Sequence, residues 1–208
     1  MAQNSIFTRA SGAWSESPPG KVFARSGTTD RIRGLYVRSA GSWKNIWNFF
    51  LGSIVPDSDI ETTNWTPTPL YLELNEDIPD DATTEITADF SGSSEQIKDF
   101  EVGLSNPIIT PTAGEVVTMR VRSYLELLVG NSFNSVTMEL KQGTTVKASR
   151  SQSVPDGYIT VVRVLSQAEK DSITDWDNLR VRVEFAVTGD DGSSTSKAHV
   201  TWIELEFS

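Results

Sequence analysis

The sequence predicts an all-β protein in which a short N-terminal β-hairpin repeat segment is followed by an antiparallel β-sandwich with a jelly-roll-like strand order. Three observations carry this prediction. A short aromatic unit containing glycine recurs in the first fifty residues, apolar and polar residues alternate along much of the remaining chain, and one short segment alone has the pattern of a helix.

Composition agrees with a folded chain of modest size. Of the 208 residues 38% are hydrophobic and 22% are charged, which is typical of globular proteins. The absence of cysteine excludes disulfide bonds and thiolate metal sites.

The first residues lack the features of a signal peptide, and no apolar stretch is long enough to span a bilayer. We therefore expect synthesis in a cytoplasm and no membrane insertion.

Charge is divided unequally along the chain. Residues 1–50 contain seven Lys or Arg and two acidic residues, a net charge of +5, whereas the remaining residues carry a net charge of −15. Such asymmetry is typical of two regions that face different partners. Two interpretations stay open for the basic region: contact with the acidic domain of a neighbouring copy, or contact with another protein. Nucleic acid is not expected as a partner, because the acidic remainder repels phosphate.

The recurring unit occupies residues 7–14, 23–30 and 36–43. Its consensus is an aromatic residue, any residue, Arg, one or two small residues, Gly, a small residue and Trp. The middle copy is one residue shorter and lacks the Trp. Aromatic and β-branched residues favour strands, and Ser or Ala followed by Gly favours a tight turn, so each unit predicts a β-hairpin.

Hairpins this small cannot bury their aromatic residues alone, so the segment needs a surface to pack against. That surface is either the following domain of the same chain or a partner protein. If it is a partner, aromatic and Arg residues of the repeats are the expected contacts. The candidate docking residues are Trp14, Phe23, Arg25, Tyr36, Arg38 and Trp43.

The three units, and above all residues 34–44, resemble the "YVR-GG-W" hairpin repeats found near the termini of many minor tail and other accessory virion proteins of tailed phages. Residues 173–183 are similar to the closing part of β-sandwich domains in the same class of proteins. The resemblance implies a virion protein made in the host cytoplasm, with other phage structural proteins as partners and several identical copies per particle. No long fibre repeat or coiled coil follows the hairpins, which argues against a long tail fibre.

A domain boundary is expected near residue 53, which separates a basic docking segment (1–53) from an acidic β-sandwich domain (54–208). Residues 56–59 predict a turn. Beyond it, period-two alternation predicts about eight strands, with a hairpin turn at residues 141–145. The expected strands lie at residues 70–74, 84–90, 100–104, 117–127, 136–140, 158–165, 179–187 and 200–207. Ser166 and Glu169 have the spacing of a capping box, which predicts a short helix over residues 166–173.

The residues give little support to an enzyme. His199, the one histidine, lies in a predicted strand with no nucleophile in view, so we expect no catalysis. An acidic stretch has enough oxygen ligands for calcium, but its spacing matches no EF-hand pattern and a solvated loop is the simpler interpretation, so no cofactor is expected. This stretch consists of Glu73, Glu76, Asp77, Asp80, Asp81 and Glu85.

Four arginines occupy polar faces of predicted strands. If they are adjacent they form a basic strip for carboxylates or glycans; the alternative is cross-strand ion pairing with Glu126, Glu184, Glu204 or Glu206. The four residues are Arg120, Arg122, Arg180 and Arg182.

These observations predict a non-enzymatic structural protein of a tailed phage particle. It docks through its repeats onto the tail, the tail tip or a short fibre and projects the sandwich outward. Two alternatives remain: a head decoration or head-fibre protein, and a host-adsorption module that binds a surface glycan.

Overall fold

The structure is a computed structural model that describes residues 6–10, 13–17, 35–39, 42–47, 52–76, 84–107, 110–111, 114–129, 132–154, 157–189 and 195–208. The chain divides into two compact units, residues 1–52 and 53–208. No helix within the described ranges is long and apolar enough to cross a membrane.

Within its described residues, the first unit contains two separate antiparallel hairpins. One is formed by β1 (Ile6–Ala10) and β2 (Ala13–Ser17), and the other by β3 (Leu35–Ser39) and β4 (Ser42–Trp47). They coincide with the first and third copies of the repeat, whose predicted hairpins are confirmed. The middle copy lies outside the described residues.

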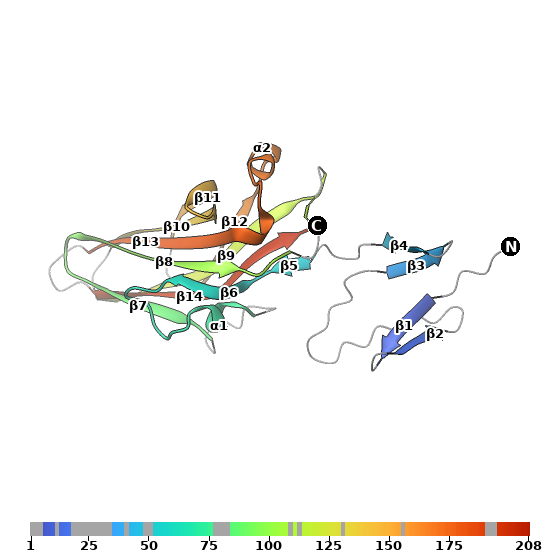
Figure 1. Ribbon diagram of the computed structural model, residues 1–208. Helices are drawn as coiled ribbons and strands as arrows, with labels where there is room; N and C mark the ends of the chain where they lie inside the picture. Colours follow the sequence, from blue (N-terminus) through green and yellow to red (C-terminus); the bar gives the residue numbers. More distant parts are fainter. Residues whose placement is uncertain are drawn as a thin grey trace. The chain divides into compact units, whose positions relative to one another are not determined.

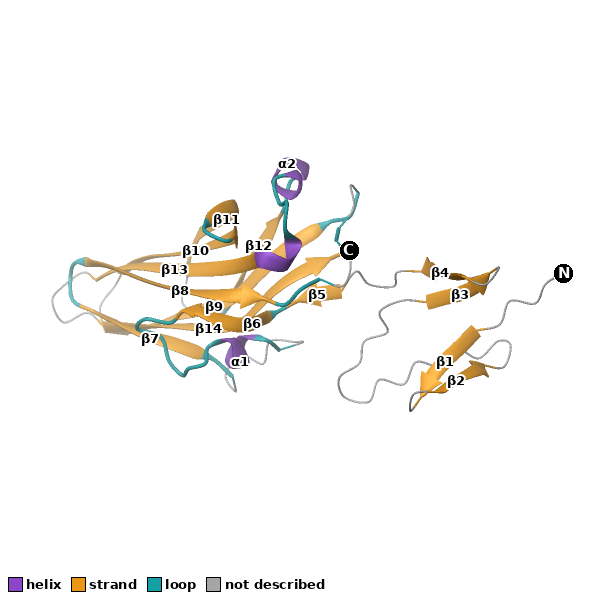
Figure 2. Ribbon diagram, viewed as in Figure 1, coloured by secondary structure: helices purple, strands orange, loops and turns teal. Residues whose placement is uncertain are grey.

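The second unit is a sandwich of two antiparallel sheets, whose strands are labelled in Figures 1 and 2. In both figures β13 lies above β14, and we name the sheet that contains β13 the upper sheet and the sheet that contains β14 the lower sheet. The upper sheet has the order β11-β10-β13-β8-β6. Its strands are β6 (Pro56–Glu61), β8 (Glu95–Leu104), β10 (Ser132–Gln142), β11 (Thr145–Ser153) and β13 (Leu179–Gly189).

The lower sheet has the order β12-β9-β14-β5, and β7 also pairs with β14. β9 pairs with one edge of β14. The other edge of β14 pairs with β7 over residues 195–200 and with β5 beyond that stretch. The strands are β5 (Gly52–Ile54), β7 (Ile86–Ser91), β9 (Val117–Val129), β12 (Ile159–Val164) and β14 (Thr195–Phe207).

The eight strands β7 to β14 have the order of a jelly roll. They form the four-stranded paths β7-β14-β9-β12 and β8-β13-β10-β11, so that consecutive strands mostly alternate between the sheets. The predicted sandwich and its jelly-roll-like order are therefore confirmed. In β13 every second residue from Leu179 to Val187 is buried, and these side chains meet those of the opposite sheet.

Two local predictions were wrong. Residues 56–59 form part of β6 rather than a turn; β6 is an edge strand with an irregular register against β8, a place that tolerates proline at its first residue. Residues 70–74 were expected as a strand, but Tyr71–Leu74 form helix α1. Both oxygens of Asp59 accept hydrogen bonds from the backbone N–H groups of Leu70 and Tyr71, at 2.9 Å each. This carboxylate satisfies the first turn of the helix from outside it.

The capping box at Ser166 and Glu169 is present. It begins helix α2 (Gln167–Asp171), and the 3₁₀ turn η1 (Trp176–Asn178) precedes β13. The backbone N–H of Glu169 donates to Ser166 Oγ at 3.3 Å, and the Ser166 backbone N–H donates to the Glu169 carboxylate at 2.7 Å. Arg163, on β12, donates to the same carboxylate at 2.6 Å. The box thus joins α2 to the lower sheet.

We expect the contribution of Glu169 to stability to disappear in acid. Burial raises the pKa of Glu169, but hydrogen bonds from Arg163 and Ser166 outweigh it and hold the pKa below its ordinary value of 4.5. A lowered folded-state pKa means that this stability is fully present above pH 4.5 and is lost as the pH falls through the folded-state pKa.

The substitution Glu169→Gln should lower the free energy of unfolding by about 1 kcal/mol at pH 7. Urea unfolding of the variant and the wild type at pH 7 and pH 3 measures this difference. It should shrink at pH 3; an equal difference at both pH values would mean that the carboxylate charge plays no part. Asp171→Asn, in the same helix and exposed, is the control.

Candidate functional site

The two described hairpins place the same residue types opposite each other. Arg9 pairs with Trp14 across β1 and β2, and Arg38 pairs with Trp43 across β3 and β4. Two residues separate the strands in each case. The repeat unit therefore encodes one register, in which Arg and Trp occupy facing positions of an antiparallel pair. The signal in the sequence is the spacing of five residues from Arg to Trp with the glycine between them.

Of the predicted docking residues, Trp14, Tyr36, Arg38 and Trp43 lie in these strands. Phe23 and Arg25, in the middle copy, lie outside the described residues. The structure gives the backbone register of the four placed residues.

The four arginines of the predicted basic strip do not form one strip. Arg120 and Arg122 are on β9 of the lower sheet, whereas Arg180 and Arg182 are on β13 of the upper sheet. All four project from the outer faces of their sheets, so the thickness of the sandwich separates the two pairs. The sequence shows which face of a strand is polar, but it does not show which sheet the strand joins.

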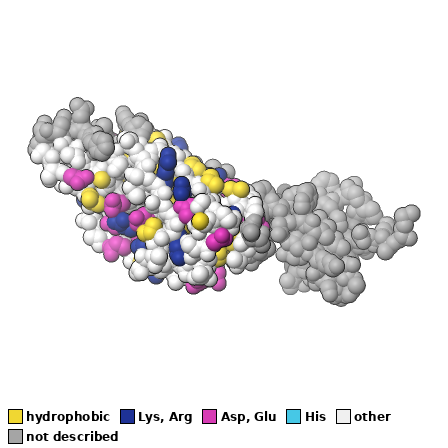
Figure 3. All heavy atoms as spheres, turned by 90° about the horizontal axis from the view of Figure 1, so that it is seen from above, with side chains coloured by type: hydrophobic (Ala, Val, Ile, Leu, Met, Phe, Trp, Pro, Cys, Tyr) yellow, Lys and Arg dark blue, Asp and Glu magenta, His cyan; other side chains and the backbone are white. Residues whose placement is uncertain are grey.

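The outer face of the upper sheet is covered by ion pairs. Arg182 contacts three carboxylates at 2.6–3.2 Å, those of Glu184, Asp99 and Glu139. Burial lowers the pKa of Arg182, but the carboxylates outweigh it and raise the pKa above its ordinary value. Next to it, Glu101 pairs with both Arg180, at 3.2 Å, and Lys141. Figure 3 views the second unit from the side of β11 and α2, and there too basic and acidic side chains are interspersed.

The outer face of the lower sheet differs, because rings lie among its charges. Tyr124 of β9 lies between two rings: Tyr158, with centroids 5.1 Å apart, and His199 of β14, with centroids 5.2 Å apart and planes at 29°. The guanidinium of Arg122 lies 5.4 Å from the Tyr158 ring centroid and donates to Thr160 at 3.2 Å. The register explains the row, since Tyr124 pairs with His199, and Arg122 pairs with Thr160.

Two carboxylates lie beside His199, and the contact with Glu85 is a hydrogen bond. Its Nδ1 is 2.9 Å from Glu85 Oε2, and its Nε2 is 3.4 Å from Glu126 Oε2. Tyr158 also donates to Glu85, at 3.4 Å. The His199 side chain is 10% exposed, whereas Glu85 and Glu126 are 28% and 40% exposed. We name the set Tyr124, Tyr158, His199, Arg122, Glu85 and Glu126 the tyrosine cluster.

Part of the predicted acidic stretch adjoins the tyrosine cluster. The indole N–H of Trp202 donates to the backbone oxygen of Glu76 at 2.9 Å, and the Thr84 hydroxyl donates to the Glu76 carboxylate. Asp77, Asp80 and Asp81 lie outside the described residues. Within the described part of the chain, no three His, Asp or Glu side chains lie together as metal ligands would.

Sequence reasoning placed His199 in a strand but missed the tyrosine cluster. The available signal was an aromatic residue on the polar side of an alternating strand: Tyr124 stands between Arg122 and Glu126 in the polar series of β9. The contacts with Tyr158 and Glu85 depend on which strands pair.

A separate hollow lies between Phe90, Gly92 and Val187. Its volume is about 10 Å³, which is room for about one water molecule.

No family model and no curated protein matches the chain. Among solved structures it is similar to a CBM4 structure, at 11% identity, 64% of this chain, 90% of that chain and a TM-score of 0.38. It is also similar to TmCBM61 in complex with β-1,4-galactotriose, at 10% identity, 58% and 68% coverage and a TM-score of 0.29. A third similarity is to the enzymatically active domain of tailspike protein 4 of bacteriophage CBA120, at 12% identity, 76% and 19% coverage and a TM-score of 0.35. Likenesses at this level concern the β-sandwich fold class and leave the ligand and the partners of this chain open.

Proposed function

We propose that this chain is a non-enzymatic structural protein of a tailed phage particle. Its N-terminal repeats dock it on the tail, the tail tip or a short fibre, with several copies per particle, and the sandwich projects outward. The observation that carries the proposal is the repeated hairpin register, in which Arg faces Trp in both described hairpins. A register that recurs with the same residue pair supports a recurring contact, since packing on one's own domain does not require the same pair twice.

The chemistry of the repeats fits docking. Trp and Arg are the residues most enriched among those that dominate binding energy at protein interfaces, because they combine a large contact area with hydrogen bonding. The net charge of +5 in residues 1–50 favours an acidic partner surface. The resemblance to hairpin repeats of accessory virion proteins supports a phage particle as that partner.

We expect Trp43→Ala to weaken binding to particles assembled without this protein by about 10- to 100-fold, which corresponds to about 1.4–2.8 kcal/mol. The measurement is a titration of fluorescently labelled protein onto purified particles, with unbound protein removed by sedimentation. Arg38→Ala should weaken binding in the same direction, because Arg38 faces Trp43 in the register.

Lys44→Ala is the control, since Lys44 adjoins Trp43 in β4 but is not part of the repeat consensus. Deleting residues 1–52 should abolish binding and leave a cooperative thermal transition for the sandwich. If the truncated protein joins particles at the wild-type level, the sandwich itself docks and the proposal fails.

A further inference from the structure

We propose that the tyrosine cluster is a binding site for a neutral oligosaccharide. The site lies on the outer face of the lower sheet, where β14, β9 and β12 run side by side. This proposal goes beyond docking and does not depend on how residues 1–52 are attached.

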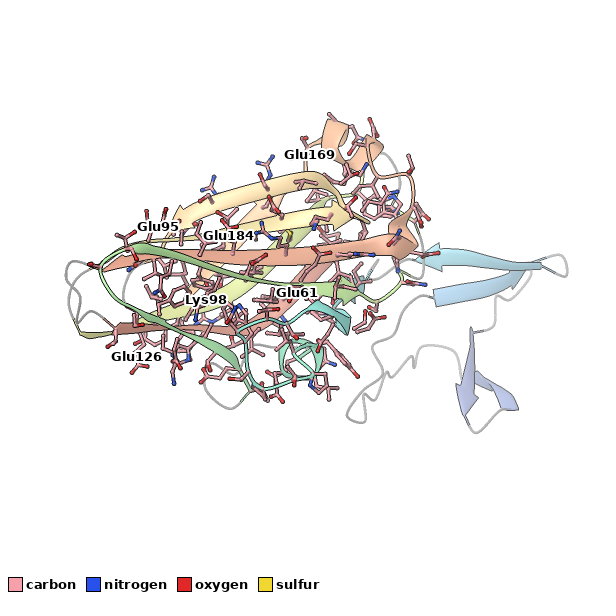
Figure 4. All side chains as sticks on the ribbon, turned by 60° about the vertical axis from the view of Figure 1, so that its left-hand side comes forward. Glu61, Glu95, Lys98, Glu126, Glu169 and Glu184 are labelled. Carbon is pink, nitrogen blue, oxygen red and sulfur yellow. The ribbon has the colours of Figure 1, made fainter. Side chains whose placement is uncertain are left out.

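The two outer faces of the sandwich differ in what they offer a ligand. On the upper sheet the charged groups are engaged with one another: Arg182 contacts three carboxylates, and Glu101 contacts two cations. A ligand there must break ion pairs before it binds. On the lower sheet, rings replace part of this ion-pair network. In Figure 4, Glu184 marks the upper sheet and Glu126 marks the lower one.

The rings form a row that crosses three neighbouring strands. Tyr158 precedes β12, Tyr124 is in β9 and His199 is in β14, and consecutive centroids are 5.1 and 5.2 Å apart. Neighbouring strands are spaced by about 4.8 Å, so the row follows the strand spacing and extends across the sheet. Tyr124 and Tyr158 are half-buried. The C–H faces of sugar rings are apolar, and an aromatic platform of this kind offers them a rigid surface to stack on.

Polar groups border the rings where sugar hydroxyls need partners. The Glu126 and Glu85 carboxylates are hydrogen-bond acceptors for hydroxyl groups, and both are partly exposed. On the other side, Arg122 and Thr160 lie beside Tyr158. An aromatic surface with a few well-placed polar groups is the usual composition of a site that recognises a polar organic ligand.

The charges in the cluster select against anionic glycans. Two carboxylates flank His199, and the acidic residues Glu204 and Glu206 pair with Arg120 further along the same face. An anionic sugar placed over Tyr124 meets the repulsion of Glu126 and Glu85 at short range. A neutral sugar hydrogen-bonds to the same groups without this penalty.

His199 acts as a positioning residue. Its side chain is 90% buried and stacks on the Tyr124 ring. Its Nδ1 forms a hydrogen bond with Glu85, and Glu126 lies 3.4 Å from its Nε2. It thereby holds Glu85, which precedes β7, and contacts Tyr124 of β9, across β14. Because Glu85 and the Tyr124 ring are held before the ligand arrives, these two side chains lose little conformational entropy on binding.

The test is isothermal titration of the full-length protein with oligosaccharides of equal length. The neutral probes are β-linked glucose, galactose and N-acetylglucosamine oligomers, and the anionic probe is an oligogalacturonate. We expect at least one neutral probe to bind and the anionic probe to bind more weakly. Tyr158→Ala should weaken binding of the neutral probe by about tenfold or more, or about 1.4 kcal/mol.

Matched variants separate the site from the fold. Thr160→Ala, beside Arg122, should weaken binding, whereas Thr137→Ala, the same change on the outer face of the upper sheet, should not. Glu126→Gln keeps the side-chain shape and removes one charge, so the preference for neutral over anionic probes should narrow. This readout keeps the test valid if Tyr158→Ala fails to fold.

The proposal is overturned if no neutral probe binds the folded wild type, if the oligogalacturonate binds more tightly than every neutral probe, or if folded Tyr158→Ala binds as the wild type does. Each of these results leaves particle docking untouched, because docking is measured with particles and with variants of residues 1–52.

Discussion

Replacement of Trp65 by Ala should lower the free energy of unfolding by about 3–5 kcal/mol, the range for removal of a fully buried aromatic side chain. Trp65 is 2% exposed, and the next residue, Thr66, pairs with Thr87 of β7 in the lower sheet. The Trp65 ring packs edge-on against Phe100 of β8, with ring centroids 4.8 Å apart, and against Phe185 of β13, with ring centroids 5.7 Å apart. The substitution removes both ring contacts and leaves a cavity that the two packed sheets cannot close.

Urea unfolding followed by far-ultraviolet circular dichroism measures this loss. Leu72→Ala is the control, because Leu72 is 52% exposed in α1, close to Trp65 in sequence. The control should change the free energy of unfolding by less than about 0.5 kcal/mol. A loss below about 1 kcal/mol for Trp65→Ala would contradict its place in the core.

The second large effect is expected for Arg182→Met, which should lower the free energy of unfolding by about 1–3 kcal/mol. This range lies between the values for exposed and buried ion pairs, because the Arg182 side chain is 26% exposed. The loss of the guanidinium leaves the carboxylates of Asp99, Glu139 and Glu184 facing one another without their shared cation. Their repulsion adds to the lost hydrogen bonds.

Arg150→Met, on the exposed edge strand β11, removes the same charge and serves as the control. Urea unfolding at low and high ionic strength distinguishes the repulsion between the carboxylates from the loss of their hydrogen bonds to Arg182. Salt screens the repulsion, so the difference between the Arg182 variant and the wild type should shrink at high salt. A difference equal to that of the Arg150 variant would show that the three ion pairs contribute nothing to stability.

The strands with strict alternation could be predicted in detail. In β13 the residues from Leu179 to Val187 are alternately buried and partly exposed, as the pattern indicates. The hairpin turn between β10 and β11 was also predictable, because Gly143 has a φ of +56°, a conformation that favours glycine. These features depend on neighbouring residues and on a period of two, both of which are readable along the chain.

Shorter segments were ambiguous for a physical reason. Leu70, Leu72 and Leu74 alternate as in a strand, but residues four apart also share one face of a helix. The structure buries Leu70 and Leu74 and exposes Leu72, which is the helical solution. Asp59, eleven residues earlier, decides between the two by accepting hydrogen bonds at the start of the helix. A local pattern cannot contain such a distant contact.

The sequence by itself determined the all-β class, the repeated hairpins, the division of charge and the polar or apolar side of each regular strand, because these follow from local residue preferences and periodicity. Tertiary structure alone decided which strands share a sheet. It separated Arg120 and Arg122 from Arg180 and Arg182, and it joined Tyr124 to His199 and Glu85. Strand pairing in a jelly roll brings together residues more than a hundred positions apart, such as Glu85 and His199, and no local pattern along the chain records those pairs.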